Sequence, residues 1–444
     1  MILLEIGLVL ILLAAPLPFG AVGPAGRAAL EIGALTLTAL WAVLALTRPV
    51  ALPPRAARVA IVALLGLAAL QAVPLGHGVV QALSPRAEAL RAGLDPAAAA
   101  TLSLAPGATA SALRTGAALA GILLVATSVA AERGATRLAL AGLVSAAFQG
   151  LYGLLALASG HARIWNVAKT AYLDSATGTF VNKNHFAGFL AATIPMGIGL
   201  AVLAGREARA LGRRRRGLLL AFGPGGTRAL FLVLLLLPAL GGLLLSFSRA
   251  GIALGLAGAA ATAFLSISAR PRTRIAAIVL VVAIAAVPLV DLGAERLAGR
   301  YATSGSDLGA AGGRGTVWLG TLAIVRAFPA TGCGFGSFTW VFPVFSDPEV
   351  RLHYTHAHND LLQLGAEGGI GAWILLGALL AALAGAGRLA LRSDPSPVVI
   401  GAAAGLAAIL LHGLVDFDFH IPADAAIAAV LAGILFGTAW NARP

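Results

Sequence analysis

Apolar runs whose length matches a lipid bilayer recur along the whole sequence. Each run covers about 17 to 22 residues, and a helix of that length crosses a hydrocarbon core of roughly 30 Å. Only 11% of the residues are charged, less than half the share found in soluble domains, and strand-like alternation is absent. We predict an all-α integral membrane protein with about twelve transmembrane helices. The predicted spans lie near residues 3–19, 28–47, 58–76, 113–131, 138–158, 185–204, 229–246, 250–268, 275–291, 368–387, 397–415 and 421–440.

The distribution of arginine predicts the orientation of these spans. Positive residues near span ends are retained on the cytoplasmic side. With the N-terminus inside, the cytoplasmic connections hold more than half of the Lys and Arg residues, including the run Arg213-Arg214-Arg215-Arg216. An even number of spans places both termini in the cytoplasm. We therefore expect one polytopic membrane domain over residues 1–444, with residues 292–367 as a large, partly helical external loop.

The charge balance excludes one class of partner. The chain carries a net charge of +13, but its basic residues are scattered between spans and no nucleic-acid reading element accompanies them. Anionic lipid headgroups are the partners that basic residues beside membrane spans usually contact. The sequence holds one cysteine, Cys333, so it forms no intramolecular disulfide.

A dense polar cluster closes the largest external loop. Three imidazoles and a carboxylate occur between His353 and Asp360, and such groups are costly in an apolar chain. Three interpretations stay open: a metal site built from the three histidines and Asp360, hydrogen bonding that only holds the loop together, and catalysis or substrate contact. We favour the third.

Polar residues also stand where the span near residue 185 begins. The sequence there reads Asn182-Lys183-Asn184-His185. Asn184 can cap the following helix, but Lys183 and His185 add charge that a cap does not need. We expect this segment to contact a ligand as well as to cap the helix.

Two arginines are predicted on the same external side. Arg249 lies in a very tight connection between two predicted spans. Boundary arginines often only extend toward water, but this connection is too short for that, so we expect the guanidinium to point into a cavity. Arg314 begins a predicted loop helix over residues 314–327, which carries Trp318 and ends before Pro329.

Three further features have plainer interpretations. The glycine run from Gly332 to Gly336 lacks the Lys-Ser/Thr of a phosphate-binding loop and is predicted to form a turn. Glu367 is predicted to cap the positive end of its own helix. The segment from Asp416 to His420 is predicted to be an ordinary hydrated turn, although its polar side chains could also line the cavity.

Motifs in a fixed order resemble the O-antigen ligase and polymerase superfamily of bacterial inner membranes. The similarity covers roughly residues 110–420, and the His-x-His-Asn-Asp element with its following Glu-x-Gly is the most specific part. The motifs are Gly178-Thr179-Phe180-Val181-Asn182-Lys183-Asn184-His185-Phe186-Ala187-Gly188, Ser248-Arg249-Ala250-Gly251, Gly313-Arg314-Gly315 with Trp318 and Pro329-Ala330-Thr331-Gly332-Cys333-Gly334, and His356-Ala357-His358-Asn359-Asp360-Leu361-Leu362-Gln363 with Glu367-Gly368-Gly369.

The resemblance implies a GT-C-like enzyme of the bacterial inner membrane whose active site faces the periplasm. Such an enzyme moves a glycan from undecaprenyl diphosphate to an acceptor hydroxyl, and the ligase branch needs no metal ion or other cofactor. By resemblance, Arg249 and Arg314 contact the diphosphate and His358 is the general base. The external loops lack a long basic surface for a phosphorylated lipid A-core, so the acceptor stays open.

The chemistry of arginine and histidine side chains agrees with these assigned roles. Guanidinium forks stabilise the charge of a departing diphosphate without a metal ion. A neutral imidazole that accepts the acceptor's proton contributes roughly 10² to 10⁴ in rate. We expect His358 to be this base, with His356 as the alternative and Asn359 or Asp360 as the orienting group. Donor contacts are expected from Arg249, Arg314, Lys183, Asn182, Asn184, His185 and Trp318.

Other functions remain possible at this stage. We favour a ligase with lipid A-core or a similar glycolipid as acceptor, over a polymerase or a protein O-oligosaccharyltransferase of the same superfamily. A transporter or flippase for lipid-linked glycans is the alternative from another class. Transporters place their charges near the middle of spans, whereas the polar cluster here lies in an external loop.

Overall fold

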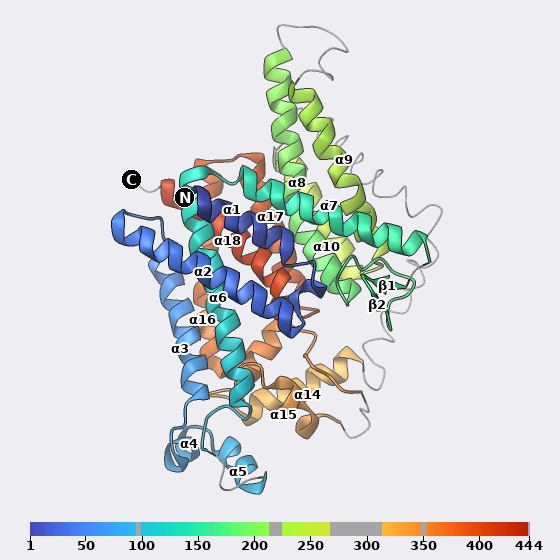
Figure 1. The fold of residues 1–444 in the computed structure, drawn as a ribbon. Helices are drawn as coiled ribbons and strands as arrows, with labels where there is room; N and C mark the ends of the chain where they lie inside the picture. The colour runs from blue at the N-terminus through green and yellow to red at the C-terminus, as the bar shows by residue number, and fades with distance from the viewer. Residues whose placement is uncertain (95–98, 161, 213–223, 267–312, 348–351, 443–444) are drawn as a thin grey trace.

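The computed structural model describes residues 1–94, 99–160, 162–212, 224–266, 313–347 and 352–442 (Figure 1). Within these residues, nine helices are long and apolar enough to cross a bilayer. The strands in this part form one short antiparallel hairpin, β1 (Arg163–Ile164) with β2 (Val167–Ala168). The prediction of an all-α integral membrane protein is confirmed. The nine helices are α2 (Pro24–Thr47), α3 (Arg55–Ala72), α6 (Pro106–Arg133), α7 (Thr136–Ala158), α8 (Lys183–Gly212), α9 (Pro224–Leu245), α10 (Arg249–Ser266), α16 (Asp360–Ser393) and α18 (Pro422–Asn441).

The remaining predicted spans have different outcomes. Two coincide with shorter apolar helices, α1 (Ile2–Ala14) and α17 (Pro397–His412). The first helix ends at Ala14 and not near residue 19, because Pro16 and Pro18 cannot continue it. The predicted span at 275–291 and the first part of the large loop, residues 292–312, lie outside the described residues.

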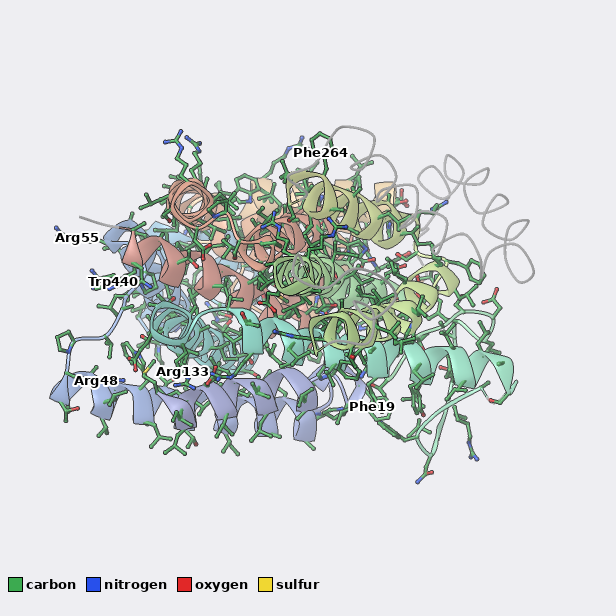
Figure 2. The ribbon with its side chains drawn as sticks, turned by 90° about the horizontal axis from the view of Figure 1, so that it is seen from above. Phe19, Arg48, Arg55, Arg133, Phe264 and Trp440 are labelled. Atoms are coloured by element: carbon green, nitrogen blue, oxygen red, sulfur yellow. The ribbon has the colours of Figure 1, made fainter. Side chains whose placement is uncertain are left out.

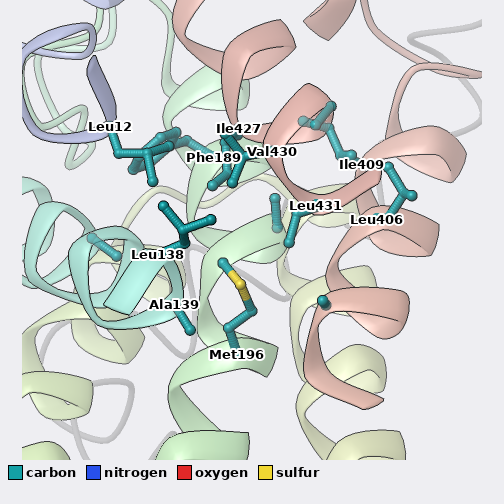
Figure 3. Close-up of a cluster of buried hydrophobic side chains, with 14 of the residues drawn as sticks. Leu12, Leu138, Ala139, Phe189, Met196, Leu406, Ile409, Ile427, Val430 and Leu431 are labelled. Carbon is teal, nitrogen blue, oxygen red and sulfur yellow. The ribbon is translucent and has the colours of Figure 1, made fainter. Parts of the chain in front are cut away.

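The core of the bundle forms around α8. This helix packs against α7, α9, α10 and α17, and most of its apolar window is buried. Figure 3 shows Phe189 and Met196 of α8 among apolar side chains from α1, α7, α17 and α18. The approach of α17 is close enough that a Cβ on Gly405 would overlap the carbonyl oxygen of Ala192. Small residues thus allow two backbones to touch, as membrane helices commonly require.

The chain's two ends lie at the same end of the molecule (Figure 1). Figure 2 shows Arg48, Arg133 and Trp440 on the same side of the molecule in the view from above. Arg48 pairs with Glu132 at 3.0 Å, and Arg133 pairs with the buried Glu5 of α1. These contacts join the ends of α1, α2 and α6. The polar loops lie at the opposite end of the molecule.

That opposite end carries the short helices. They are η1 (Phe19–Ala21), α4 (His77–Leu83), α5 (Pro85–Leu94), α14 (Arg314–Ala327), α15 (Phe338–Phe345) and η3 (Asp418–His420). Figure 1 shows α4, α5, α14 and α15 together at the end away from both termini. The helix predicted over residues 314–327 is confirmed, since α14 has these bounds.

Helix α16 is broken, and the glycine-rich turn holds the break in place. Gly369 has φ +67° and ψ −168°, so residues 360–368 form a separate segment before the long span. The amides of Cys333 and Gly334 donate to the carbonyls of Ala366 and Glu367 at 2.9 and 3.0 Å. The turn predicted at this glycine run is confirmed. Its role is to satisfy carbonyls that the break leaves open.

We had predicted that Glu367 caps its own helix. This prediction was wrong, because that helix begins at Asp360. Its buried carboxylate instead accepts from the amide of Phe338, the first residue of α15, at 3.2 Å, and from the side chain of Gln363 at 3.1 Å. A carboxylate at a helix N-terminus is favourable there. Glu367 therefore fixes α15 against the short first segment of α16.

Candidate active site

Asp416 is the buried centre of an ion cluster at the end that carries the short helices. It lies between α17 and η3, and 1% of its side chain is exposed. Arg314 Nη2 lies 3.0 Å from its Oδ2, and His185 Nε2 and His358 Nδ1 lie 3.4 and 3.5 Å from its Oδ1. One carboxylate thus joins three predicted site residues, which come from the start of α14, the start of α8 and the loop before α16.

These neighbours keep Asp416 ionised. Burial alone would raise the pKa of this carboxyl, but its two imidazole neighbours and the charge of Arg314 outweigh burial and hold the pKa well below its usual value. Our prediction of an ordinary hydrated turn from Asp416 to His420 was wrong. The turn folds inward, because its acids at 416 and 418 find cationic or imidazole partners inside the protein.

Phe417 packs the imidazoles together. Its ring centroid lies 4.3 Å from that of His185, 4.4 Å from that of His356 and 4.8 Å from that of His358. The ring stacks on His356 and meets the other two edge to face. Aromatic contacts of this kind restrict the positions of the rings, so one apolar side chain sets the spacing of three polar ones.

A second imidazole–carboxylate pair lies beside the first. His420 Nδ1 is 2.8 Å from Asp360 Oδ1. The side-chain oxygen of Gln363 accepts from the amide of Ala357 at 2.9 Å, which identifies its nitrogen as the donor. That nitrogen lies 3.0 Å from His420 Nε2 and 3.2 Å from His356 Nδ1. Its two hydrogens are shared among these two ring nitrogens and Glu367 Oε1, which lies 3.1 Å away.

Two histidines of the predicted cluster differ in their surroundings. Burial and the neighbouring imidazoles lower the pKa of His356 to about 2, and its Nδ1 faces the Gln363 amide. His358 has 25% of its side chain exposed. Its backbone is held at φ +50°, and Trp318 Nε1 donates to its carbonyl at 3.3 Å. Of the two, His358 has the geometry of a usable base, and Trp318 supports its strained backbone.

Both asparagines next to the predicted charged residues act as helix caps. Asn359 Oδ1 accepts from the amide of Leu362 at 2.9 Å at the start of α16. Asn182 Oδ1 accepts from the amide of Asn184 at 2.9 Å at the start of α8. We had considered Asn184 as the cap of α8, but the residue whose side chain caps this helix is Asn182. The Asn182 cap fixes the start of α8, whose first residue is Lys183.

Three helices at this end begin with a cation. Lys183, Arg249 and Arg314 are the first residues of α8, α10 and α14. Lys183 is buried, and its Nζ lies 3.4 Å from the carbonyl oxygen of Phe247, two residues before Arg249. A positive side chain is unfavourable at the positive end of a helix. Three such ends near one another have the charge pattern of an anion-binding site.

The metal interpretation gains no geometric support. His353 lies apart from the other histidines, and its Nε2 is 3.2 Å from Thr339 Oγ1. In the described part of the chain, no group of three or more His, Cys, Asp or Glu side chains is placed to hold a metal ion. The observed partners of His356 and His358 are instead an amide and a carboxylate.

Sequence reasoning missed the residues that organise the site. Asp416, Phe417 and Gln363 connect the predicted residues, and none of them was predicted to do so. The turn from Asp416 to His420 holds two acids and an imidazole in five residues between two apolar spans. Costly polar groups are at least as dense here as in the histidine cluster, so the sequence did carry a signal.

Comparison with known families supports the resemblance given above. Residues 231–377 match the family model described as "O-Antigen ligase". The match includes Arg249, Arg314 and His358, and it supports placing the chain with the O-antigen ligase and polymerase superfamily. A comparison with curated proteins found no match.

Proposed function

We propose, with its similarity to O-antigen ligases as the premise, that this membrane protein is a glycosyltransferase that joins a lipid-linked glycan to an acceptor hydroxyl. In the detailed form of the proposal, the donor is a glycan on undecaprenyl diphosphate and the reaction occurs at the periplasmic face of the bacterial inner membrane. A ligase is the first choice, and a polymerase or protein O-oligosaccharyltransferase is the alternative within the superfamily. The observation that carries the proposal is the Asp416 carboxylate, which joins Arg314 to His358.

His358 is the proposed general base. Asp416 lies at its Nδ1 side, so a proton on Nδ1 faces the carboxylate and Nε2 keeps its lone pair. An acceptor hydroxyl then gives its proton to Nε2 as its oxygen attacks the anomeric carbon. The bond between that carbon and the diphosphate oxygen breaks, and its electron pair stays on the diphosphate. Asp416 stabilises the imidazolium that forms.

The cations at the helix starts are the proposed leaving-group site. Arg314 uses Nη2 for Asp416, and a third of its side chain is exposed, so its remaining donors can reach a substrate. Arg249 and Lys183 begin the neighbouring helices α10 and α8. Paired guanidinium donors match the oxygens of a diphosphate. Charge that develops on the leaving group therefore meets fixed positive charge.

A transfer assay with purified protein tests this proposal. The reaction contains the protein in detergent, undecaprenyl-diphosphate-linked glycan and a core glycolipid, and mass spectrometry detects the covalent product. Arg314→Lys should reduce the rate because a point charge replaces a two-pronged donor, and His358→Gln should reduce it about a hundredfold or more. Arg326→Gln is the matched control, since Arg326 is exposed on the same helix.

The outcomes separate the candidate functions. Product on the glycolipid supports a ligase, and extension of the lipid-linked glycan supports a polymerase. Movement of the lipid across a vesicle without a new glycosidic bond would instead identify a transporter and contradict the proposal. Full activity of both site variants would leave the family assignment intact but remove the assigned roles.

A further inference from the structure

An apolar groove lies between α1 and α2 on the outer side of the bundle. Its volume is about 340 Å³, and its walls run from Gly7 to Pro18 on one side and from Gly26 to Leu37 on the other. Figure 1 shows α1 and α2 side by side, and in Figure 2 they form one edge of the molecule. Eleven residues of helix rise about 16 Å, so the groove is long enough for a segment of a hydrocarbon chain.

Arg27 directly follows Gly26, which lines one end of this groove. Its Nε is buried, and in the described ranges that atom has no hydrogen-bond partner. The usual helical partner would be Glu31, four residues later. Glu31 is engaged elsewhere, by Thr115 Oγ1 at 2.6 Å and Arg114 at 3.7 Å on α6. The guanidinium of Arg27 is therefore available to an anion, and burial makes such a partner valuable.

The same end of the groove adjoins the candidate active site. The turn before α2 contains Gly20, which has φ +72°, and a Cβ there would lie 2.8 Å from Phe180 and 3.2 Å from Ile421. Phe180 lies in the loop that leads into α8, and Ile421 follows His420. Arg27 thus lies in the first turn of α2, close to the turn that carries one of the two imidazole–carboxylate pairs.

Electrostatics at His420 agrees with this placement. Burial lowers the pKa of its imidazole, and the hydrogen bond and charge of Asp360 raise it above the usual value. The positive charge of Arg27 lies close enough to oppose Asp360. The guanidinium and the imidazole therefore share one electrostatic environment at the mouth of the groove.

We propose that the groove holds the isoprenoid chain of the lipid-linked donor and that Arg27 binds one of its phosphates at the entrance to the active site. This inference rests on the proposed function. A chain in the groove, with its phosphate at Arg27, would present the glycan beside the two imidazole–carboxylate pairs. A bulk phospholipid seated there would obstruct the donor, so the donor is the occupant to which we commit.

Binding of undecaprenyl diphosphate to the purified protein in detergent, followed by native mass spectrometry, tests the inference. Gly33→Leu should fill the groove, because a Cβ there meets no atom within 4 Å. Gly66→Leu on α3 is the matched control, since its Cβ is equally unobstructed. For the charge, Arg27→Gln is compared with Arg55→Gln, because Figure 2 places Arg55 and the Arg48 end of α2 away from Phe19.

Gly33→Leu and Arg27→Gln should each weaken binding about tenfold or more, while both controls bind as the wild type does. With inorganic diphosphate as the probe, Arg27→Gln should weaken binding and Gly33→Leu should not. Wild-type affinity in Gly33→Leu or Arg27→Gln would overturn the inference, and so would equal displacement of undecaprenyl diphosphate by phosphatidylglycerol. If Gly33→Leu fails to fold, Ala29→Phe fills the same groove.

The transfer assay distinguishes this failure from failure of the proposed function. A wild-type protein that makes product, together with Gly33→Leu and Arg27→Gln variants of unchanged kcat/KM, would refute the groove site alone. A wild-type protein that binds undecaprenyl diphosphate through the groove but makes no product would refute the proposed transfer and leave the groove site standing.

Discussion

Replacing Asp416 by Asn tests whether the buried carboxylate supports catalysis and not only the fold. The amide has nearly the same shape, and its oxygen can still accept from the amide of Phe417, as Asp416 does at 3.0 Å. The change therefore removes one negative charge beside His358 with little loss of packing. Arg314 loses its partner as well, but a third of its side chain is exposed and water can solvate it.

The expected loss follows from the distance between the charges. An imidazolium and a carboxylate about 4 Å apart attract each other by about 4 kcal/mol at an effective dielectric constant of roughly 20. The 3.5 Å separation between His358 Nδ1 and Asp416 Oδ1 exceeds an ordinary hydrogen bond, so part of that energy is lost. We expect kcat to fall about 10² to 10³-fold, while KM for the donor changes less than about threefold because Arg314 keeps its charge.

Steady-state transfer rates at several pH values provide the measurement. The pKa of Asp416 lies well below its usual value, so any stability from its ionised form is present above the unfolded-state pKa. That contribution is lost only as the pH falls through the depressed folded-state value. Asp416 is thus ionised throughout pH 5 to 8, and an acid limb in that range reports on an imidazole. Asp174→Asn, at an exposed site in the loop between α7 and α8, is the control.

One result would refute this reasoning. If Asp416→Asn is folded and retains more than half of the wild-type kcat, the carboxylate does not support the base. A large rise in KM with unchanged kcat would assign Asp416 to donor binding through Arg314 instead.

Two further predictions follow from the geometry. His356→Gln should lower kcat far less than His358→Gln, because the pKa of His356 is about 2 and its ring packs against Phe417. Equal losses in single-turnover assays would contradict the choice of His358 as the base. Gly332→Ala should lower the free energy of unfolding by about 1 to 3 kcal/mol, since Gly332 has φ +66° and a Cβ would overlap the carbonyl of Glu367; an unchanged denaturation midpoint in detergent would show that the turn tolerates a side chain.

Much of the fold was predictable because membrane helices leave a strong signal in sequence. Each described span coincides with a predicted apolar run, and the loop helix from Arg314 to Ala327 was predicted with its observed bounds. Helix ends were less predictable. The break at Gly369 escaped prediction because the apolar pattern continues across it, and because the hydrogen bonds that stabilise it come from distant residues, among them Cys333 and Gln71.

The site was predictable in composition but not in connectivity. His185, Arg314 and His358 were selected from separate segments, and the structure brings them together at Asp416. That residue is 58 positions from His358, and nothing local in the sequence links the two. A cap at the start of α8 was predicted because capping is a local interaction, but on Asn184, whereas the observed caps are Asn182 and Asn359. Pairings through a buried carboxylate depend on tertiary packing, which periodicity does not report.

The two acids that flank Phe417 point to different partners. Asp416 meets Arg314 at 3.0 Å, whereas Asp418, two residues later, meets His412 at 2.6 Å. Most surface connections in proteins accept insertions and deletions over evolution. This one cannot change length by a single residue without exchanging the acids and moving the aromatic ring, so among related chains its spacing should vary less than that of any neighbouring loop.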